Sequence, residues 1–137
     1  MVVDASVVVG AVLAADGFDI FGDEQLVAPA LLWSEARSVL HTKVWRGEVP
    51  TSEVQLLKQR LAAVPVQSEN PSDLGAQSWT IADELGWART YDAEYVALAR
   101  ILGCRLVTAD TRLRRGADRL GFVVGPTELW GRPVSPA

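Results

Sequence analysis

The chain has 137 residues, of which 49% are hydrophobic and 22% are charged, and its net charge is −4. These values are ordinary for one globular domain and exclude a disordered protein. With one cysteine and one histidine, the sequence excludes a disulfide framework and a zinc site of the Cys/His type. Neither a signal-peptide pattern nor an apolar run of membrane-spanning length is visible. We therefore expect a single domain, residues 1–137, in the cytoplasm and without a membrane partner.

The first half of the chain predicts short strands that alternate with helices. Residues 1–3 form a buried strand that ends at Asp4, and either Asp4 or Ser6 caps the helix that follows. Residues 26–28 are the second strand. Pro29 then opens a long helix that runs to about residue 46, and residues 51–64 form its partner in a helical hairpin.

The second half continues this alternation. Residues 64–66 are extended, residues 74–85 form a helix that Gly86 ends, and Asp92 caps an apolar helix that ends at Gly103. Residues 106–109 and 122–124 are strands, with a short helix from Asp110 between them. Such alternation predicts the α/β class, with a parallel sheet covered on both faces and ligands bound at the carboxyl ends of the strands.

Asp4 and Asp110 each come directly after an apolar strand. In a parallel sheet both residues would emerge at the carboxyl edge, where ligands usually bind. A helix cap or a turn explains either aspartate alone. The two residues therefore indicate a site only in combination with further acidic residues.

Glu35 lies within the apolar stripe of its predicted helix. At about 100° per residue, it shares one face with Leu31, Leu32, Ala36 and Val39. An unpaired carboxylate there carries a desolvation cost, so it needs a cation, a bound metal or a route to solvent. Pairing with a distant arginine is the competing explanation.

Asp92 stands at the start of the most apolar predicted helix, where capping is the ordinary role of an aspartate. Its importance comes from the other three acids. If all four converge at one edge of the sheet, hard divalent cations such as Mg²⁺ or Mn²⁺ would relieve their repulsion through oxygen ligands. These ions orient and deprotonate water and stabilise a leaving oxygen, which is the chemistry that phosphodiester hydrolysis needs.

Four segments together resemble a known protein family. They are residues 2–6 (VVDAS), 32–36 (LWSEA), 91–99 (YDAEYVALA) and 106–113 (LVTADTRL). In order and spacing they are similar to the PIN domain, and in particular to the VapC-type toxins of bacterial toxin–antitoxin pairs. The resemblance covers almost the whole chain. The chain departs from the family pattern at its start, where Asp4 leaves a first strand of only three residues.

The resemblance implies a PIN-like three-layer α/β/α fold with a central, mainly parallel sheet. It implies an endoribonuclease that hydrolyses RNA with Mg²⁺ or Mn²⁺, and it assigns the metal and the catalysis to Asp4, Glu35, Asp92 and Asp110. Ser6 and Thr108 match small hydroxyl positions that support the site. The resemblance also implies a homodimer and a cognate antitoxin protein that silences the enzyme.

Some basic and aromatic residues remain open to two interpretations. Arg112, Arg114, Arg115 and Arg119 follow Asp110 and either grip phosphate or form a solvated face paired with Asp118, which we favour. We expect core packing for most of Trp33, Trp45 and Trp79, with a dimer or antitoxin surface as the alternative. Glu94 is a weak candidate for the acidic site because it points to another side of its helix, and His41 receives no role.

Three other functions compete with a nuclease. A receiver-like signalling domain also gathers acids at strand ends, but it needs a lysine at its last strand, and Lys43 and Lys58 lie in predicted helices. A phosphatase of the haloacid dehalogenase type needs a second aspartate where Ser6 stands. A PIN-like binding module without catalysis is the third alternative, and the complete set of four acids argues against it.

Overall fold

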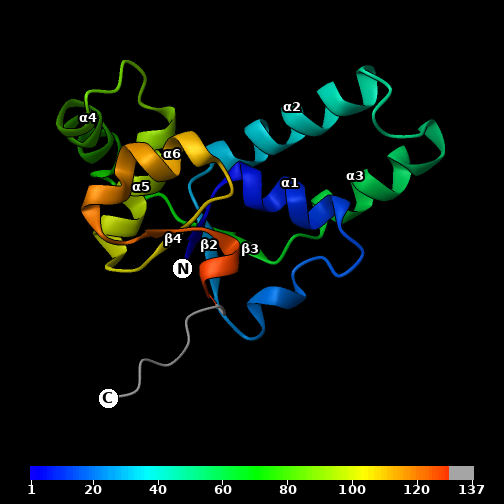
Figure 1. Cartoon of the computed structure of the whole chain (residues 1–137), viewed down its shortest axis with the longest axis horizontal. Coiled ribbons are helices and arrows are strands. Elements are labelled where there is room, and N and C mark those ends of the chain that lie inside the picture. Colours follow the sequence, from blue (N-terminus) through cyan, green and yellow to red (C-terminus); the bar gives the residue numbers. More distant parts are fainter. Residues whose placement is uncertain (130–137) are drawn as a thin grey trace.

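A five-stranded parallel sheet forms the centre of the computed structural model, which describes residues 1–129 (Figure 1). Its strands are β1 (Val2–Val3), β2 (Leu26–Ala28), β3 (Val66–Ser68), β4 (Leu106–Val107) and β5 (Val123–Val124). They lie in the order β3-β2-β1-β4-β5, and all neighbours pair in parallel. Parallel neighbours need long crossover connections, and the helices supply them. The predicted α/β class with a parallel sheet is confirmed.

Six α-helices of the described chain cover the two faces of this sheet. They are α1 (Ala5–Leu13), α2 (Leu31–Trp45), α3 (Val54–Ala62), α4 (Leu74–Leu85), α5 (Tyr91–Leu102) and α6 (Thr111–Ala117). Short 3₁₀ helices, η1 (Asp19–Phe21), η2 (Thr51–Glu53), η3 (Asp118–Leu120) and η4 (Pro126–Leu129), lie in the connections. Helices α1 to α3 gather on one side and α4 to α6 on the other (Figure 1), which gives the predicted three-layer arrangement.

The order of the strands places the ends of β1 and β4 beside each other. The chain runs from β1 outward to β2 and β3, then returns to β4 on the opposite side of β1. Val3 pairs with Val107 in register, and the amide of Asp4 donates a hydrogen bond of 3.3 Å to the carbonyl of Val107. Such a reversal of strand order opens a crevice at the carboxyl ends of the strands, where α/β proteins bind ligands.

Local signals explain where several helices begin and end. Asp4 caps α1, so the first of the two predicted caps, and not Ser6, is correct. Gly86 and Gly103 end α4 and α5 in the left-handed conformation, which glycine adopts without a Cβ clash. The predicted cap of α5 is wrong, because Thr90 precedes that helix and Asp92 lies inside its first turn.

Two further expectations need correction. The long helix starts at Leu31 and not at Pro29, and the third strand is Val66–Ser68 instead of residues 64–66.

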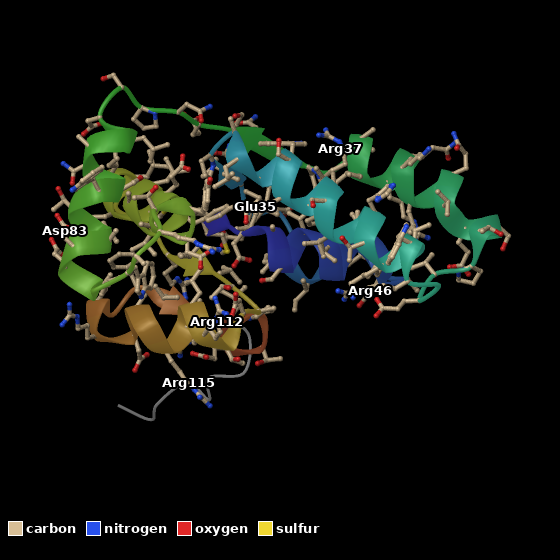
Figure 2. All side chains as sticks on the ribbon, turned by 90° about the horizontal axis from the view of Figure 1, so that it is seen from above. Glu35, Arg37, Arg46, Asp83, Arg112 and Arg115 are labelled. Atoms are coloured by element: carbon tan, nitrogen blue, oxygen red, sulfur yellow. The ribbon has the colours of Figure 1, made fainter. Side chains whose placement is uncertain are left out.

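The predicted hairpin of α2 and α3 is present, and it projects beyond the sheet (Figures 1 and 2). None of the helices in residues 1–129 has the length and apolar character needed to cross a bilayer.

The core lies between the sheet and the helices packed on it. All the side chains of β1 and β4 are buried, as is every residue of α5 from Tyr95 to Ala99. The prediction that most tryptophans pack in the core is wrong, because Trp45 is 81% exposed and Trp79 is 68% exposed. Trp33 alone of the three predicted residues packs partly buried against the core.

Candidate acidic site

The four predicted acids surround one cavity of about 340 Å³ at the carboxyl edge of the sheet, which we call the acidic cavity. Asp4 follows β1, Asp110 follows β4, Glu35 lies on α2 and Asp92 lies on α5. Ser6, Lys43 and Tyr95 are among the other residues that line it. The fold therefore brings together carboxylates from four separate segments of the chain.

Asp4 is the most deeply buried of these acids, with 4% of its surface exposed. Its Oδ1 accepts hydrogen bonds from the hydroxyl of Ser6 at 2.6 Å and from the amide of Val7 at 3.2 Å. Its Oδ2 accepts a hydrogen bond from the hydroxyl of Thr108. Burial raises the pKa of Asp4 and the negative charge of Asp110 raises it further, although the hydrogen bonds from Ser6, Thr108 and Val7 partly oppose this.

Ser6 and Thr108 join the ends of the two strands. The amide of Ala109 donates to the Ser6 hydroxyl at 2.9 Å, and the amide of Asp110 donates to the Thr108 hydroxyl at 3.0 Å. Each hydroxyl therefore donates to Asp4 and accepts from the backbone that follows β4. The two hydroxyl groups fix the Asp4 carboxylate relative to the segment that carries Asp110.

Asp110 caps α6 with one of its two carboxylate oxygens. Its Oδ1 accepts hydrogen bonds from the amides of Arg112 at 2.8 Å and Leu113 at 3.4 Å. Its Oδ2 accepts no hydrogen bond from any other group in residues 1–129. The cap thus orients the side chain and leaves one oxygen for a ligand.

A buried tyrosine holds Glu35. The hydroxyl of Tyr95, which is 1% exposed, donates a hydrogen bond of 2.7 Å to Oε1 of Glu35. Burial and the nearby carboxylate raise the pKa of Tyr95 far above its ordinary value, so the hydroxyl remains a donor. The competing explanation, an arginine paired with Glu35, is wrong for residues 1–129, where the ion pairs involve other acids.

The acids on the helices, Glu35 and Asp92, are repelled by the other carboxylates of the site. Burial is the largest cause of the raised pKa of Glu35, to which the charges of Asp92, Asp4 and Glu94 add, while the Tyr95 hydrogen bond opposes it. Burial also raises the pKa of Asp92, the charge of Asp110 adds to this, and Arg112 opposes it. Glu94 lies outside the lining of the acidic cavity, as expected, but its charge reaches Glu35.

Lys43 is a member of the cavity lining that the sequence interpretation missed. It lies on α2, and its Nζ is 3.7 Å from a carboxylate oxygen of Glu48. Glu35, Val39 and Lys43 follow each other at intervals of four residues, which places them along one face of the helix. The four-residue spacing from Glu35 could therefore have predicted that Lys43 lies near the acidic site.

The four arginines that follow Asp110 fall into different environments. Arg114 pairs with Glu128 at 2.7 Å and with Asp118, and Arg119 donates to the carbonyl of Glu84. In Figure 2, Arg112 lies on the side of α6 toward Glu35, whereas Arg115 points outward. The predicted pairing with Asp118 is therefore correct for Arg114 alone. The positive charge of Arg112 acts on Asp92, whose pKa it lowers against the effects of burial and of Asp110.

The arrangement concentrates negative charge without a finished coordination shell. Within residues 1–129, no three Asp, Glu, His or Cys side chains are grouped closely enough to hold a metal ion between them. The donors around the acidic cavity are carboxylate oxygens, which Mg²⁺ and Mn²⁺ prefer, and repulsion between them is the kind of strain that a divalent cation relieves. The chemistry of the donor set therefore fits a hard divalent cation.

Comparisons with a family model, with curated proteins and with solved structures all find similar proteins. Residues 1–119 match the PIN domain family. Ribonuclease VapC9 of Mycobacterium tuberculosis and VapC ribonuclease Mb0985 of Mycobacterium bovis are each 34% identical over 114 residues, which is 82% of this chain and 87% of the relative. Among solved structures, PAE2754 from Pyrobaculum aerophilum is similar with a TM-score of 0.70 and 29% identity, over 93% of this chain and 91% of that chain.

Proposed function

Because the chain belongs to the PIN-domain family and to its VapC-type members, we propose that it is an endoribonuclease, the toxin of a toxin–antitoxin pair. The observation that carries this proposal is the set of four carboxylates around one cavity, at the crevice between β1 and β4. A receiver-like domain or a binding module without catalysis is not favoured, because neither explains the complete set. The reaction is hydrolysis of an RNA phosphodiester bond.

Mg²⁺ or Mn²⁺ is the cofactor in this proposal, with Asp4, Glu35, Asp92 and Asp110 as its ligands. The hard oxygen donors of all four side chains support this assignment, as do the raised pKa values of Asp4, Glu35 and Asp92. When bound, such an ion neutralises phosphate charge and lowers the pKa of water. Glu35 and Asp92 are only partly buried, so their side chains have room to adjust around an ion.

The other residues of the site orient these groups and attract the substrate. Ser6 and Thr108 fix the Asp4 carboxylate, and Tyr95 fixes Glu35 through its hydroxyl. Lys43 lines the acidic cavity and the charge of Arg112 acts on Asp92, so both offset the repulsion that a phosphate would meet there.

The proposal extends to the partners of the protein. An antitoxin protein blocks the acidic cavity, two copies of the chain form a homodimer, and the protein acts in the cytoplasm. The similarity to VapC proteins over most of the chain supports these statements.

The test is cleavage of mixed cellular RNA by the purified protein with Mg²⁺, with Mn²⁺ and with a chelator. We expect metal-dependent cleavage by the wild type and a loss of about 100-fold or more in Asp110→Asn, as for the removal of a group that stabilises charge in a transition state. Asparagine caps helices as well as aspartate does, so this variant should stay folded.

Asp83→Asn is the matched control, because Asp83 is an exposed aspartate on the outer side of α4 (Figure 2). It should cleave like the wild type. A folded wild type that cleaves no RNA with either metal would contradict the proposal, as would full activity in Asp110→Asn.

A further inference from the structure

A larger cavity of about 660 Å³ opens beside the acidic cavity, between the start of α5 and α6, and we call it the side cavity. Its lining includes Glu35 and Asp92, which also line the acidic cavity. The remaining lining residues are Gly86, Trp87, Ala88, Arg89, Tyr91, Arg112 and Leu113. Because the two cavities share two carboxylates, a ligand in the side cavity lies directly beside the acids.

Two cations of the side cavity are not neutralised by ion pairs. Arg89 and Arg112 are exposed, and the ion pairs found within residues 1–129 use neither of them. By contrast, Arg100 pairs with Glu84 and Arg114 pairs with Glu128. Arginine binds phosphate through a planar fork, so Arg89 and Arg112 give a polyanion a place to bind beside an acidic site that would otherwise repel it.

The side cavity also has an exposed aromatic ring. Tyr91 is the first residue of α5, and 58% of its surface is exposed. An exposed tyrosine beside arginines offers the flat apolar surface on which unpaired bases stack. Such stacking needs bases that are free of a duplex, because bases within a helix are already stacked on each other.

Trp87 forms a fixed wall of the same cavity. Its indole ring packs on Gly116 of α6, where a Cβ atom would lie only 2.9 Å from Cζ2 of the ring. The ring is partly buried against the core. Close packing against a glycine holds the wall in position, so the shape of the cavity is defined before a ligand arrives.

We propose that the side cavity binds an unpaired stretch of single-stranded RNA next to the bond that is cut, with phosphate on Arg89 and Arg112 and a base on Tyr91. The inference rests on the proposed function, because this RNA is the substrate of that activity. The cavity volume lies in the range of about 300–1,000 Å³ that is typical of sites for small ligands. Because stacking on Tyr91 needs an unpaired base, we expect a single strand and not a duplex to bind there.

The test measures binding apart from cleavage. Fluorescence anisotropy in a chelator follows a short labelled single-stranded RNA of mixed sequence with the full chain. We expect Arg89→Gln and Arg112→Gln to weaken binding and to lower the slope of log affinity against log salt by about 0.7 for each phosphate that the variant no longer neutralises. Tyr91→Ala should weaken binding by about 5-fold to 100-fold, and Tyr91→Phe should bind like the wild type.

Arg115→Gln is the matched control, since Arg115 lies on the same helix as Arg112 and points outward (Figure 2). It should bind RNA like the wild type. If Arg115→Gln and Arg112→Gln weakened RNA binding equally, the loss would be a general effect of positive charge, and the proposed binding in the side cavity would be wrong. A duplex RNA that competes as well as the single strand would overturn it too.

A second assay, cleavage with Mn²⁺, separates this inference from the proposed function. If the wild type cleaves RNA and the Arg89, Arg112 and Tyr91 variants bind and cleave it equally well, the proposed RNA binding in the side cavity is wrong and the proposed nuclease activity is supported. If the variants lose binding as expected but the wild type never cleaves RNA, RNA binding in the side cavity is supported and the proposed nuclease activity is wrong. Absence of RNA binding by the wild type would overturn the side cavity.

Discussion

Asp4 and Asp110 stand at the ends of neighbouring strands, whereas Glu35 and Asp92 are carried by helices that pack over the same edge of the sheet. Backbone amides hydrogen-bond to both strand-end acids, and the hydroxyls of Ser6 and Thr108 add to the network around Asp4. Glu35 has a single tyrosine hydroxyl as its donor, and both helical acids are only half-buried. The strand-end pair is fixed by the sheet, and the helical pair remains adjustable.

This difference predicts where substitutions will cost folding stability. Around the buried Asp4, removing a hydrogen bond leaves a buried polar group without a partner, which lowers the free energy of unfolding. On the helices, water replaces a missing partner at a smaller cost. Three experiments test the contrast.

Thr108→Val should show the largest effect. Thr108 is 1% exposed, donates to the buried Asp4 carboxylate and accepts from the amide of Asp110. Valine keeps the shape and removes both hydrogen bonds, so the free energy of unfolding at pH 7 should fall by about 2–3 kcal/mol. Urea denaturation of the metal-free protein measures it.

Two variants make this result specific. Thr108→Ser keeps the hydroxyl and should recover much of the loss. Thr51→Val removes the hydroxyl of an exposed threonine in η2 and should change stability by less than about 0.5 kcal/mol. A loss in Thr108→Val as small as that of Thr51→Val would mean that the hydroxyl network does not fix the strand-end acids.

The pH dependence of stability should show a smaller effect. Burial raises the pKa of Asp4 above its ordinary 3.8 in the folded chain. Between the ordinary and the raised value, the folded protein therefore holds more protons than the unfolded protein. By linkage, the contribution of Asp4 to the free energy of unfolding falls as pH rises through this window.

In Asp4→Asn, this fall in the free energy of unfolding between the acidic end of the window and pH 7 should be absent, as measured by urea denaturation in a chelator. Asp92→Asn should remove less, because Asp92 is only half-buried. Glu84, whose pKa is lowered by Arg100, acts in the opposite sense, and moderate salt screens that exposed pair. An equal effect of both substitutions would contradict the contrast between the two pairs of acids.

Tyr95→Phe should have the smallest effect on stability, about 1 kcal/mol or less, because water reaches the half-buried Glu35. Its effect on the proposed cofactor should be larger. Without the hydroxyl that orients Glu35, Mn²⁺ affinity measured by calorimetry should fall about tenfold. Tyr91→Phe is the control, since Tyr91 lies outside the acidic cavity lining. Unchanged Mn²⁺ affinity in Tyr95→Phe would show that packing alone positions Glu35.

The sequence predicted the strand-end side of the site better than the helical side, for a physical reason. An acid that follows an apolar strand is a local pattern, and parallel pairing then brings such ends to one edge, as for Asp4 and Asp110. The PIN-like fold and the VapC-type resemblance are likewise confirmed. The roles of the four acids stay a prediction, and the substitutions above test them.

Interactions between distant segments could not be read from the sequence. Tyr95 and Glu35 are 60 residues apart, and no local pattern connects them. Helical periodicity marks an apolar face but cannot tell that the hairpin projects beyond the sheet. Core packing was therefore expected for most of the three tryptophans, although Trp45 is exposed. Likewise, only the packing of α6 distinguishes Arg112, near the acids, from Arg114, which Glu128 and Asp118 bind.

Gly116 has a consequence for how this molecule can diverge. The indole of Trp87 rests on α6 because residue 116 carries no side chain, and neither residue lines the acidic cavity. A single added methyl group there would shift a wall of the side cavity and leave every carboxylate untouched. On the proposal for the side cavity, a substitution at Gly116 would therefore change RNA binding through the position of Trp87, at a residue that is not one of the four acids.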